Sequence, residues 1–310
     1  MEPSYLKLHS EGKLRDRAAK AVSLMGSCNI CPRGCGANRL KGETGFCGTG
    51  SKAKVVGYNA HFGEEPPLVG RYGSGTIFLS SCNLLCTFCQ NYDISHSVEG
   101  MEVEPEQMAS MMLHLAENGC HNINFVTPTH VVPQIIEALI LAVEQGLKVP
   151  LVYNSSGYDR KETLELLDGI FDIYMPDFKF WDGKWAGRFC HAPDYREVAT
   201  EAVKEMHRQV GDLVISDYGL AVRGLLVRHL VMPNRVAGTG EIMEFFADNI
   251  STNTYMNVMD QYRPCGAAHQ DEFINRRLTA REYRDALNAA ENAGLIRLDS
   301  RERIPVILQH

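Results

Sequence analysis

The sequence predicts an α/β fold: a partial (β/α)6, TIM-like barrel preceded by a small N-terminal four-cysteine metal-binding segment. From residue 75 onward, short apolar runs alternate with stretches of helical periodicity, the pattern of β-α units around a parallel sheet. Before residue 75, four cysteines crowd into a stretch with little apolar content. We therefore expect residues 1–74 to form a helix, the metal-binding segment and a connector. Residues 75–310 would form the barrel, a C-terminal helix and a tail.

The expected elements can be read in chain order. A first helix is expected at 15–24 and a short strand at 55–59. The barrel strands are expected at 76–80, 122–127, 150–154, 171–176, 225–232 and 254–259. Helices with an apolar stripe at 3.6-residue spacing are expected at 105–118, 131–145, 161–167, 195–210, 241–249 and 279–293. The alternating run 304–308 would add a strand or a lid. Active sites of such barrels lie at the C-terminal ends of the strands.

Composition excludes several classes of partner. The net charge is −7 and the basic residues are scattered, so neither nucleic acid nor an anionic membrane surface is an expected partner. No apolar stretch reaches the ~18 residues of a membrane span, and the first residues lack the apolar core of a signal peptide. We expect a cytoplasmic protein. There, cysteines indicate metal or redox chemistry rather than disulfides.

One group of cysteines directly follows the first barrel strand. Cys82, Cys86 and Cys89 stand at the spacing C-x3-C-x2-C. Iron–sulfur cubes and tetrahedral zinc sites usually take four protein ligands. Three thiolates at this spacing could hold three irons of a [4Fe–4S] cube and leave the fourth iron open for a small ligand. The alternatives are a zinc knuckle and buried free thiols.

A second group of cysteines precedes the barrel. Cys28, Cys31, Cys35 and Cys47 form the pattern C-x2-C-x3-C-x11-C. Four thiolates complete a tetrahedral site, and the glycines among them permit tight turns that aim backbone N–H groups at sulfur. Zinc, a single structural iron and an auxiliary iron–sulfur cluster all suit this ligand set. The alternative is four reduced cysteines without a metal.

The loop from Cys82 to Cys89, with the aromatic Phe88 before its last cysteine, resembles the cluster loop of the radical S-adenosylmethionine (SAM) superfamily. The resemblance implies a [4Fe–4S] cluster whose open iron binds the amino and carboxylate groups of SAM. It also implies that an electron from flavodoxin or ferredoxin cleaves SAM to methionine and a 5′-deoxyadenosyl radical. That radical abstracts a hydrogen atom from a substrate.

Three further motifs resemble the branch of that superfamily similar to pyruvate formate-lyase-activating enzyme. They are Cys31-Pro32-Arg33-Gly34-Cys35-Gly36, Thr127-Pro128-Thr129-His130 and Met259-Asp260-Gln261-Tyr262-Arg263-Pro264. This branch implies a glycyl residue of a partner enzyme as one candidate substrate. The chain departs from many members after the second strand, where it has no glycine-glycine-glutamate motif for the SAM amino group.

Polar residues at the ends of strands three to five are the candidate cofactor ligands. By resemblance to the activases, Asn154, Ser155 and Asp177 take the side of the site that contacts SAM and a monovalent cation, with Asn154 in place of an aspartate. Lys179 could pair with the SAM carboxylate. Arg228 lies in a buried strand, where a charge is costly unless paired, so it should meet either that carboxylate or Asp177.

The end of the sixth strand supplies the candidate catalytic residues. Tyr262 is placed for the adenine or the substrate, and Cys265 could donate a hydrogen atom or bind metal, although a plain buried thiol fits it as well. Cys190, in a loop after the fourth strand, could also approach the site.

Two classes of function follow. The first is a radical SAM oxidoreductase acting on a glycyl residue of a partner protein or on a small organic molecule. The second is a non-catalytic iron–sulfur or zinc protein in electron transfer or metal handling. The polar strand ends favour the first, because an electron carrier needs no SAM pocket.

Overall fold

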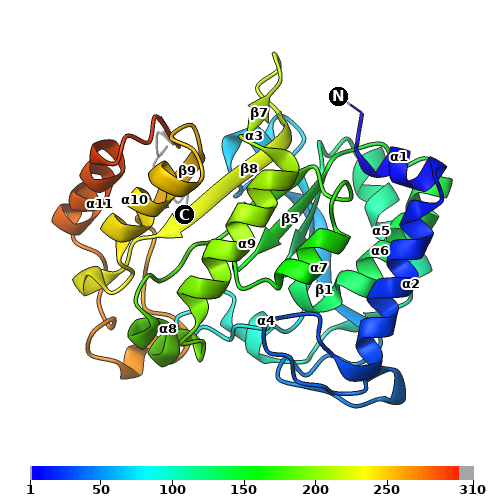
Figure 1. Cartoon of the computed structure of the whole chain (residues 1–310), viewed down its shortest axis with the longest axis horizontal. Coiled ribbons are helices and arrows are strands. Elements are labelled where there is room, and N and C mark those ends of the chain that lie inside the picture. Colours follow the sequence, from blue (N-terminus) through cyan, green and yellow to red (C-terminus); the bar gives the residue numbers. More distant parts are fainter. Residues whose placement is uncertain (1, 300–310) are drawn as a thin grey trace, which may run out of the picture.

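A large, mostly parallel sheet runs through the molecule in a computed structural model that describes residues 2–299 (Figure 1). The sheet has ten strands, with spatial order β10-β9-β8-β6-β5-β4-β2-β1-β3 and β7 paired to β8. The strands are β1 Ala53–His61, β2 Ser74–Leu79, β3 Met101–Val103, β4 Ile123–Val126, β5 Leu151–Ser155, β6 Ile173–Pro176, β7 Val214–Ile215, β8 Ala221–Leu230, β9 Tyr255–Met259 and β10 Arg297–Leu298.

Six of these strands form the predicted barrel wall. β2, β4, β5, β6, β8 and β9 are parallel neighbours in their order along the chain, as repeated β-α units produce. β1 extends the wall beyond β2 and β3 pairs with β1, both antiparallel, whereas β10 extends it beyond β9 in parallel. Within the described residues the sheet path ends at β3 and β10, so the wall is an open, partial barrel rather than a closed ring. The expected α/β fold is confirmed.

Helices cover the outer face of this wall. The helices are α1 Tyr5–Ser10, α2 Lys13–Ser23, α3 Pro66–Val69, α4 Tyr92–His96, α5 Pro105–Glu117, α6 Val132–Glu144, α7 Lys161–Leu166, α8 Gly183–Cys190, α9 Tyr195–Val210, α10 Thr239–Asn249 and α11 Ala280–Asn292. All the predicted helices are present within a few residues. The sequence missed the short α1, α3, α4 and α8, because helices of four to eight residues hold too few turns to show a period.

Successive side chains along each strand point to opposite faces of the sheet, which gives the molecule an inner and an outer apolar core. Val152, Ile173 and Leu226 pack together inside the wall with Leu68 of α3. Their sequence neighbours on the same strands face the helices and join the main apolar core. α3 occupies the end of the barrel where the strands begin, since the Asn122 side chain just before β4 donates to the Leu68 carbonyl. The inner face therefore carries apolar residues near α3 and polar ones toward the other end.

The N-terminal part joins this architecture from two sides. α2 packs against α6, and β1 is a member of the sheet. The loop between α2 and β1, drawn in blue, lies at the lower end of Figure 1, near α4. The division into residues 1–74 and 75–310 stays a prediction. The run 304–308 lies outside the described residues. In the described range, none of the helices combines the length and apolarity needed to cross a bilayer.

Candidate active site

The loop after β2 gathers three cysteines at the C-terminal end of the barrel. Cys82 and Cys86 are buried and Cys89 is partly exposed, and all three line one cavity. The Leu84 N–H donates to Cys82 Sγ at 3.3 Å. Ser81 and Leu85 hold positive φ angles of 72° and 54°, a conformation that non-glycine residues adopt at a cost. The loop is therefore folded tightly so that backbone donors and thiols face inward.

Burial keeps these thiols protonated in the metal-free chain. It raises the pKa of the Cys82 thiol to about 12, and the neighbouring Cys86 adds to the effect. Burial also raises the pKa of Cys89. Metal or cluster binding must displace these protons, since the thiolate is the ligand.

A network of charged and amide groups faces the cysteines across the same cavity. Asp177 Oδ1 accepts from Arg228 Nε at 2.7 Å, and Asp177 Oδ2 accepts from Lys179 Nζ at 2.5 Å. Arg228 Nη2 donates to Asn154 Oδ1 at 2.7 Å, and Nη1 lies 3.4 Å from a Glu64 carboxylate oxygen. The side chains of Asp177, Lys179 and Arg228 are only 15–18% exposed. Three strand ends thus deliver one connected polar cluster.

The charges in this network hold one another ionised. Burial alone would raise the pKa of Asp177, but Arg228 and Lys179 outweigh it and lower the pKa. The pKa of Lys179 is raised, because Asp177 and Cys86 more than offset the effect of burial. Glu64 is different, since burial dominates and raises its pKa despite Arg228. The cavity thus offers cationic donors opposite the cysteines, as a carboxylate ligand requires.

A second hollow continues from the first toward the end of β9. It shares Cys86, Cys89, Asp177, Lys179 and Arg228 with the first cavity. On its far side it is lined by Phe88, Gln90, Leu230, Met259 and Gln261. The site is therefore a polar pocket that opens past a more apolar rim.

Comparison with known proteins agrees with this arrangement. The model of the Radical SAM superfamily matches residues 76–225, from β2 into β8. The uncharacterized protein MJ0674 of Methanocaldococcus jannaschii is 34% identical over 288 residues, which cover 89% of this chain and 77% of that protein. The chain belongs to the radical SAM superfamily. A second protein of that organism, the uncharacterized protein MJ0808, is 27% identical over 159 residues, 45% of this chain and 46% of that protein.

Two solved structures are more distantly similar to this chain. One is anSMEcpe with bound AdoMet, at 12% identity and a TM-score of 0.48. The match covers 71% of this chain and 61% of that one. The other is Streptococcus suis SuiB bound to S-adenosylmethionine, at 13% identity and a TM-score of 0.45. It covers 71% of this chain and 47% of that one. This chain therefore matches less than two thirds of either structure.

Membership of the radical SAM superfamily implies a [4Fe–4S] cluster and SAM, and the residues present suit both. Three thiols supply soft donors for iron at a spacing that leaves one ligand position open. Lys179 and Arg228 supply the cations for a carboxylate within the same cavity. After β4, where many members carry glycine-glycine-glutamate, Thr127 lines the cavity in a left-handed conformation with φ of 62°. A β-branched residue rarely adopts that conformation outside functional sites.

Ser155 sits differently from its neighbour Asn154. Its hydroxyl donates to Asp159 Oδ2 at 2.6 Å, and Asp159 Oδ1 also accepts from Thr129 at 2.7 Å and Tyr153 at 2.9 Å. Burial raises the pKa of Asp159, although these three hydroxyl donors oppose it. The buried carboxylate fixes the ends of β4 and β5. The sequence analysis missed Asp159, because it lies four residues beyond its strand.

The two predicted catalytic residues follow the end of β9. Tyr262 is 3% exposed, and its hydroxyl donates to the Ile274 carbonyl at 2.7 Å while its ring packs near Phe88. Neither Tyr262 nor Cys265 lines the two hollows beside the cysteines. Their catalytic roles stay predictions, and Gln261 and Met259 are the residues of that strand end that face the site.

Cys190 is the cysteine that the structure adds to the site. It ends α8, is fully buried, and places its Sγ 3.4 Å from Cys86 Sγ. This contact is one of the causes that raise the pKa of Cys86. The sequence predicted that Cys190 could approach the site from a loop; in the structure it does so from the end of α8, a helix that the sequence did not predict.

The four N-terminal cysteines also converge. Cys31 is close enough to Cys28, Cys35 and Cys47 for all three to raise the pKa of its thiol, which burial brings to about 12. Their loop contacts the cluster loop through Arg33, which donates to the carbonyls of Asn83 at 2.9 Å and Cys190 at 3.0 Å. Within residues 2–299, no three His, Cys, Asp or Glu side chains are yet spaced to hold a single metal ion.

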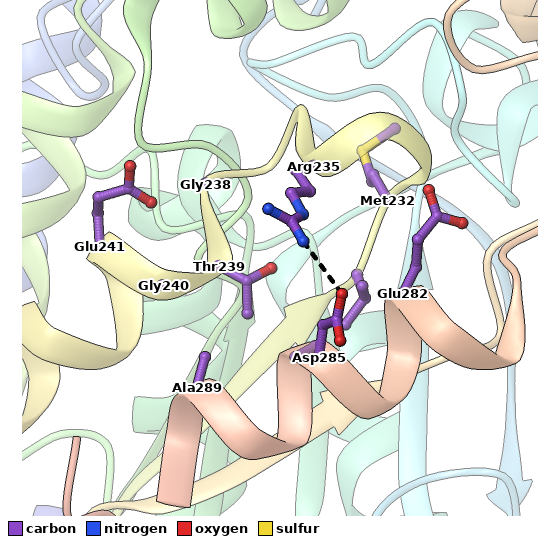
Figure 2. A pocket seen from close by; sticks show the side chains of 11 residues that line it. Met232, Arg235, Gly238, Thr239, Gly240, Glu241, Glu282, Asp285 and Ala289 are labelled. Atoms are coloured by element: carbon purple, nitrogen blue, oxygen red, sulfur yellow. Dashed lines mark hydrogen bonds and ion pairs between the residues drawn. The ribbon is translucent and has the colours of Figure 1, made fainter. Parts of the chain in front are cut away.

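A larger cavity of about 380 Å³ lies away from the cysteines, between α10 and α11 (Figure 2). Figure 2 shows Arg235 paired with Asp285 across it, at 3.1 Å. Glu282, also on its wall, is bound by Arg276 at 2.6 Å. Its Arg235–Asp285 pair is exposed, and none of its lining residues is a cysteine.

Proposed function

We propose that this protein is a radical SAM oxidoreductase in which Cys82, Cys86 and Cys89 hold a [4Fe–4S] cluster. Bound there, the cluster and SAM supply a 5′-deoxyadenosyl radical by one-electron reductive cleavage. The observation that carries the proposal is the shared cavity. Three thiols, two of them buried, and a cation-rich polar network, drawn from four strand ends, line the same space. An electron carrier would need the thiols but not the network.

The side chains around the cavity would bind and orient SAM. Lys179 and Arg228 would hold its carboxylate, because both are cationic and largely buried. Asp177 would hold those two cations in position, and with Asn154 it offers oxygen ligands for a hydroxyl or a cation. Ser155 would contribute through Asp159, by fixing the end of β5. Burial at this end of the barrel would exclude water and oxygen from the radical.

The hydrogen donor would bind beside Phe88, Leu230, Met259 and Gln261, where the cavity opens. We propose a glycyl residue of a partner enzyme, in line with the motifs of the activating-enzyme-like branch, or else a small organic molecule. Flavodoxin or ferredoxin would deliver the electron. The four N-terminal cysteines would hold a second metal within the part formed by residues 1–74.

The test is anaerobic turnover. The protein is reconstituted with iron and sulfide, mixed with SAM and dithionite, and assayed for 5′-deoxyadenosine. We expect the nucleoside from the parent and none from Cys86→Ala. Cys120→Ala is the matched control, because Cys120 is an equally buried thiol whose Sγ contacts the Tyr72 carbonyl at the opposite end of the sheet.

A parent protein with a full cluster that releases no 5′-deoxyadenosine would overturn the proposal. The electron-transfer or metal-handling function would then replace it. Equal nucleoside formation by Cys86→Ala would contradict the assignment of the three cysteines.

A further inference from the structure

An arginine is buried without a carboxylate in the N-terminal segment. Arg39 is 1% exposed, and its Nε donates to the Gly50 carbonyl at 2.9 Å. Its Nη1 donates to the His130 carbonyl at 2.8 Å and lies 3.9 Å from Cys28 Sγ. Its Nη2 is buried with no hydrogen-bond partner. Among residues 2–299, no Asp or Glu forms an ion pair with it.

Such a group needs a counter-charge. A buried, uncompensated charge costs several kcal/mol, and carbonyl oxygens satisfy hydrogen bonds without cancelling the charge. The guanidinium cannot become neutral by losing a proton, because arginine stays charged in proteins. The thiol nearest to the guanidinium is that of Cys28, 3.9 Å from Nη1, and Cys28 is one of four cysteines that already lie close together. Neutral thiols do not compensate a cation, whereas four thiolates around a divalent metal carry a net charge of −2.

We propose that Cys28, Cys31, Cys35 and Cys47 bind a thiolate-ligated metal centre whose negative charge is neutralised by the buried guanidinium of Arg39. The centre is zinc, a single ferrous iron or an iron–sulfur cluster, since Zn²⁺, Fe²⁺ and a cluster core of charge 2+ each carry a net charge of −2 with four thiolates. Its four sulfurs close in as the metal enters. This deepens the second metal site of the proposed function.

The same arginine connects the N-terminal centre to the cluster loop. The His130 carbonyl accepts from Arg39, and the His130 ring Nε2 is 2.9 Å from the Ser80 carbonyl, two residues before Cys82. Arg33, between Cys31 and Cys35, holds two further carbonyls next to the cluster site. These contacts connect the four-cysteine loop to the Cys82–Cys89 loop through Arg39, His130 and Arg33.

The first experiment isolates the N-terminal site. A full-length variant with Cys82, Cys86 and Cys89 all replaced by Ala cannot form the first cluster. It is loaded anaerobically with zinc, or with iron and sulfide, and analysed for zinc, iron and acid-labile sulfide after desalting. We expect one metal centre per chain, and none once Cys31→Ser and Cys47→Ser are added. The iron-to-sulfide ratio identifies which centre forms.

The second experiment tests Arg39 in that triple variant, by the metal-induced rise in Tm and by chelator competition. Arg39→Met removes the unpaired cation, so it should stabilise the metal-free protein and weaken the metal-loaded one. The Tm rise on loading should shrink, and the metal Kd should increase about 10–100-fold, the usual cost of losing an outer-shell partner. If Arg39 had only a structural role, Arg39→Met would lower the Tm of the metal-free and the metal-loaded protein by similar amounts.

Controls keep these outcomes interpretable. Arg223→Met is the matched control, because Arg223 is half-buried and, like Arg39, donates to neutral groups, the Ser4 hydroxyl and the Gln209 carbonyl. Its Tm rise on metal loading should equal that of the parent. Arg39→Lys keeps the charge and should bind metal more tightly than Arg39→Met.

Two results would overturn the inference. One is a triple variant that binds no metal under either loading. The other is an equal metal Kd and Tm rise in Arg39→Met and the parent. Neither result depends on SAM cleavage by the intact protein, so failure of the N-terminal site and failure of the radical SAM activity are separate outcomes.

Discussion

The two cysteine groups differ in what surrounds them more than in their spacing. Cys82, Cys86 and Cys89 lie at a cavity with Asp177 and Lys179 across from them. The N-terminal four lie in a loop beside a single buried cation, and Cys35 is exposed to solvent. The first arrangement leaves room for a charged ligand next to an open metal position. The second has a full set of thiols and one counter-charge, which suits a closed structural centre.

The largest expected effect is the loss of stability when an ion pair in the Cys82–Cys89 cavity is broken. Arg228→Met would leave Asp177 with Lys179 alone, and breaking a largely buried ion pair costs about 3–5 kcal/mol. We expect a loss of that size in the free energy of unfolding, measured by urea denaturation. Arg235→Met is the matched control, because its pair with Asp285 is exposed and should be worth about 1 kcal/mol or less. Equal losses in the two variants would contradict a special role for the cavity pair.

The contact between the two groups is the next target. Arg33→Met removes charged hydrogen bonds to the Asn83 and Cys190 carbonyls, each worth about 1.5–3 kcal/mol. Amide hydrogen exchange over residues 81–85 should become faster, as measured by mass spectrometry. In Arg160→Met, which contacts Asn29 but not the cluster loop, exchange there should be unchanged. Identical exchange in Arg33→Met and the parent would show that the two loops are independent.

The next prediction concerns His130, which connects Arg39 to the strand before the cluster loop and should make the stability depend on pH. Burial lowers the pKa of His130 to about 4, so the folded protein keeps it neutral while the unfolded chain takes up a proton below about 6.5. The stabilisation is complete above pH 6.5 and is lost as the pH falls toward 4. Between pH 7 and 5 the parent should lose about 2 kcal/mol of unfolding free energy through this group.

The matched variants for this titration are His130→Gln and His269→Gln. His130→Gln keeps a donor for the Ser80 carbonyl but does not titrate, so its unfolding free energy should fall less steeply from pH 7 to 5. The exposed His269→Gln should behave like the parent. The same slope in all three proteins would rule out His130 as a source of the pH dependence.

The smallest expected effect concerns the tuning of the cluster. The Cys190 thiol donates to Cys86 Sγ, and a hydrogen bond to a cluster sulfur stabilises the more negative, reduced state. Cys190→Ala should lower the reduction potential by about 20–60 mV, as follows from a bond worth about 0.5–1.5 kcal/mol. A potentiometric titration followed by electron paramagnetic resonance measures it, with Cys120→Ala as control. An unchanged or higher potential would contradict the prediction.

The sequence was sufficient for the wall of the barrel but not for contacts between loops. Strands such as 225–232 could be predicted, because a short apolar run between two helical stretches usually forms a buried strand. The two-residue period of a strand placed Arg228 and His229 on opposite faces, as the structure confirms. The sequence allowed Cys190 to approach the site, but its contact with Cys86 could not be predicted. It depends on how the short α8 folds back, and no local pattern encodes that packing.

The same limit explains the side-chain partners that were missed. Asp159 lies in a loop, and its three hydroxyl donors come from segments up to 30 residues away. Arg39 reads in the sequence as an ordinary surface residue, since most arginines are exposed. Only the packing of the four-cysteine loop against the barrel buries it. Local sequence patterns therefore do not show which side chains are buried by segments that are distant in the sequence.

The segment around α3 has a consequence for kinetics. Leu68 fills the inner core at the end where the strands begin, and Glu65 beside it is buried and accepts from Asn257. Molecules must then enter and leave the barrel through the rim near Phe88 and Met259. The ligand that binds deepest in the cavity has to bind first and leave last. The proposed reaction should therefore follow a compulsory order, with SAM binding before the hydrogen donor.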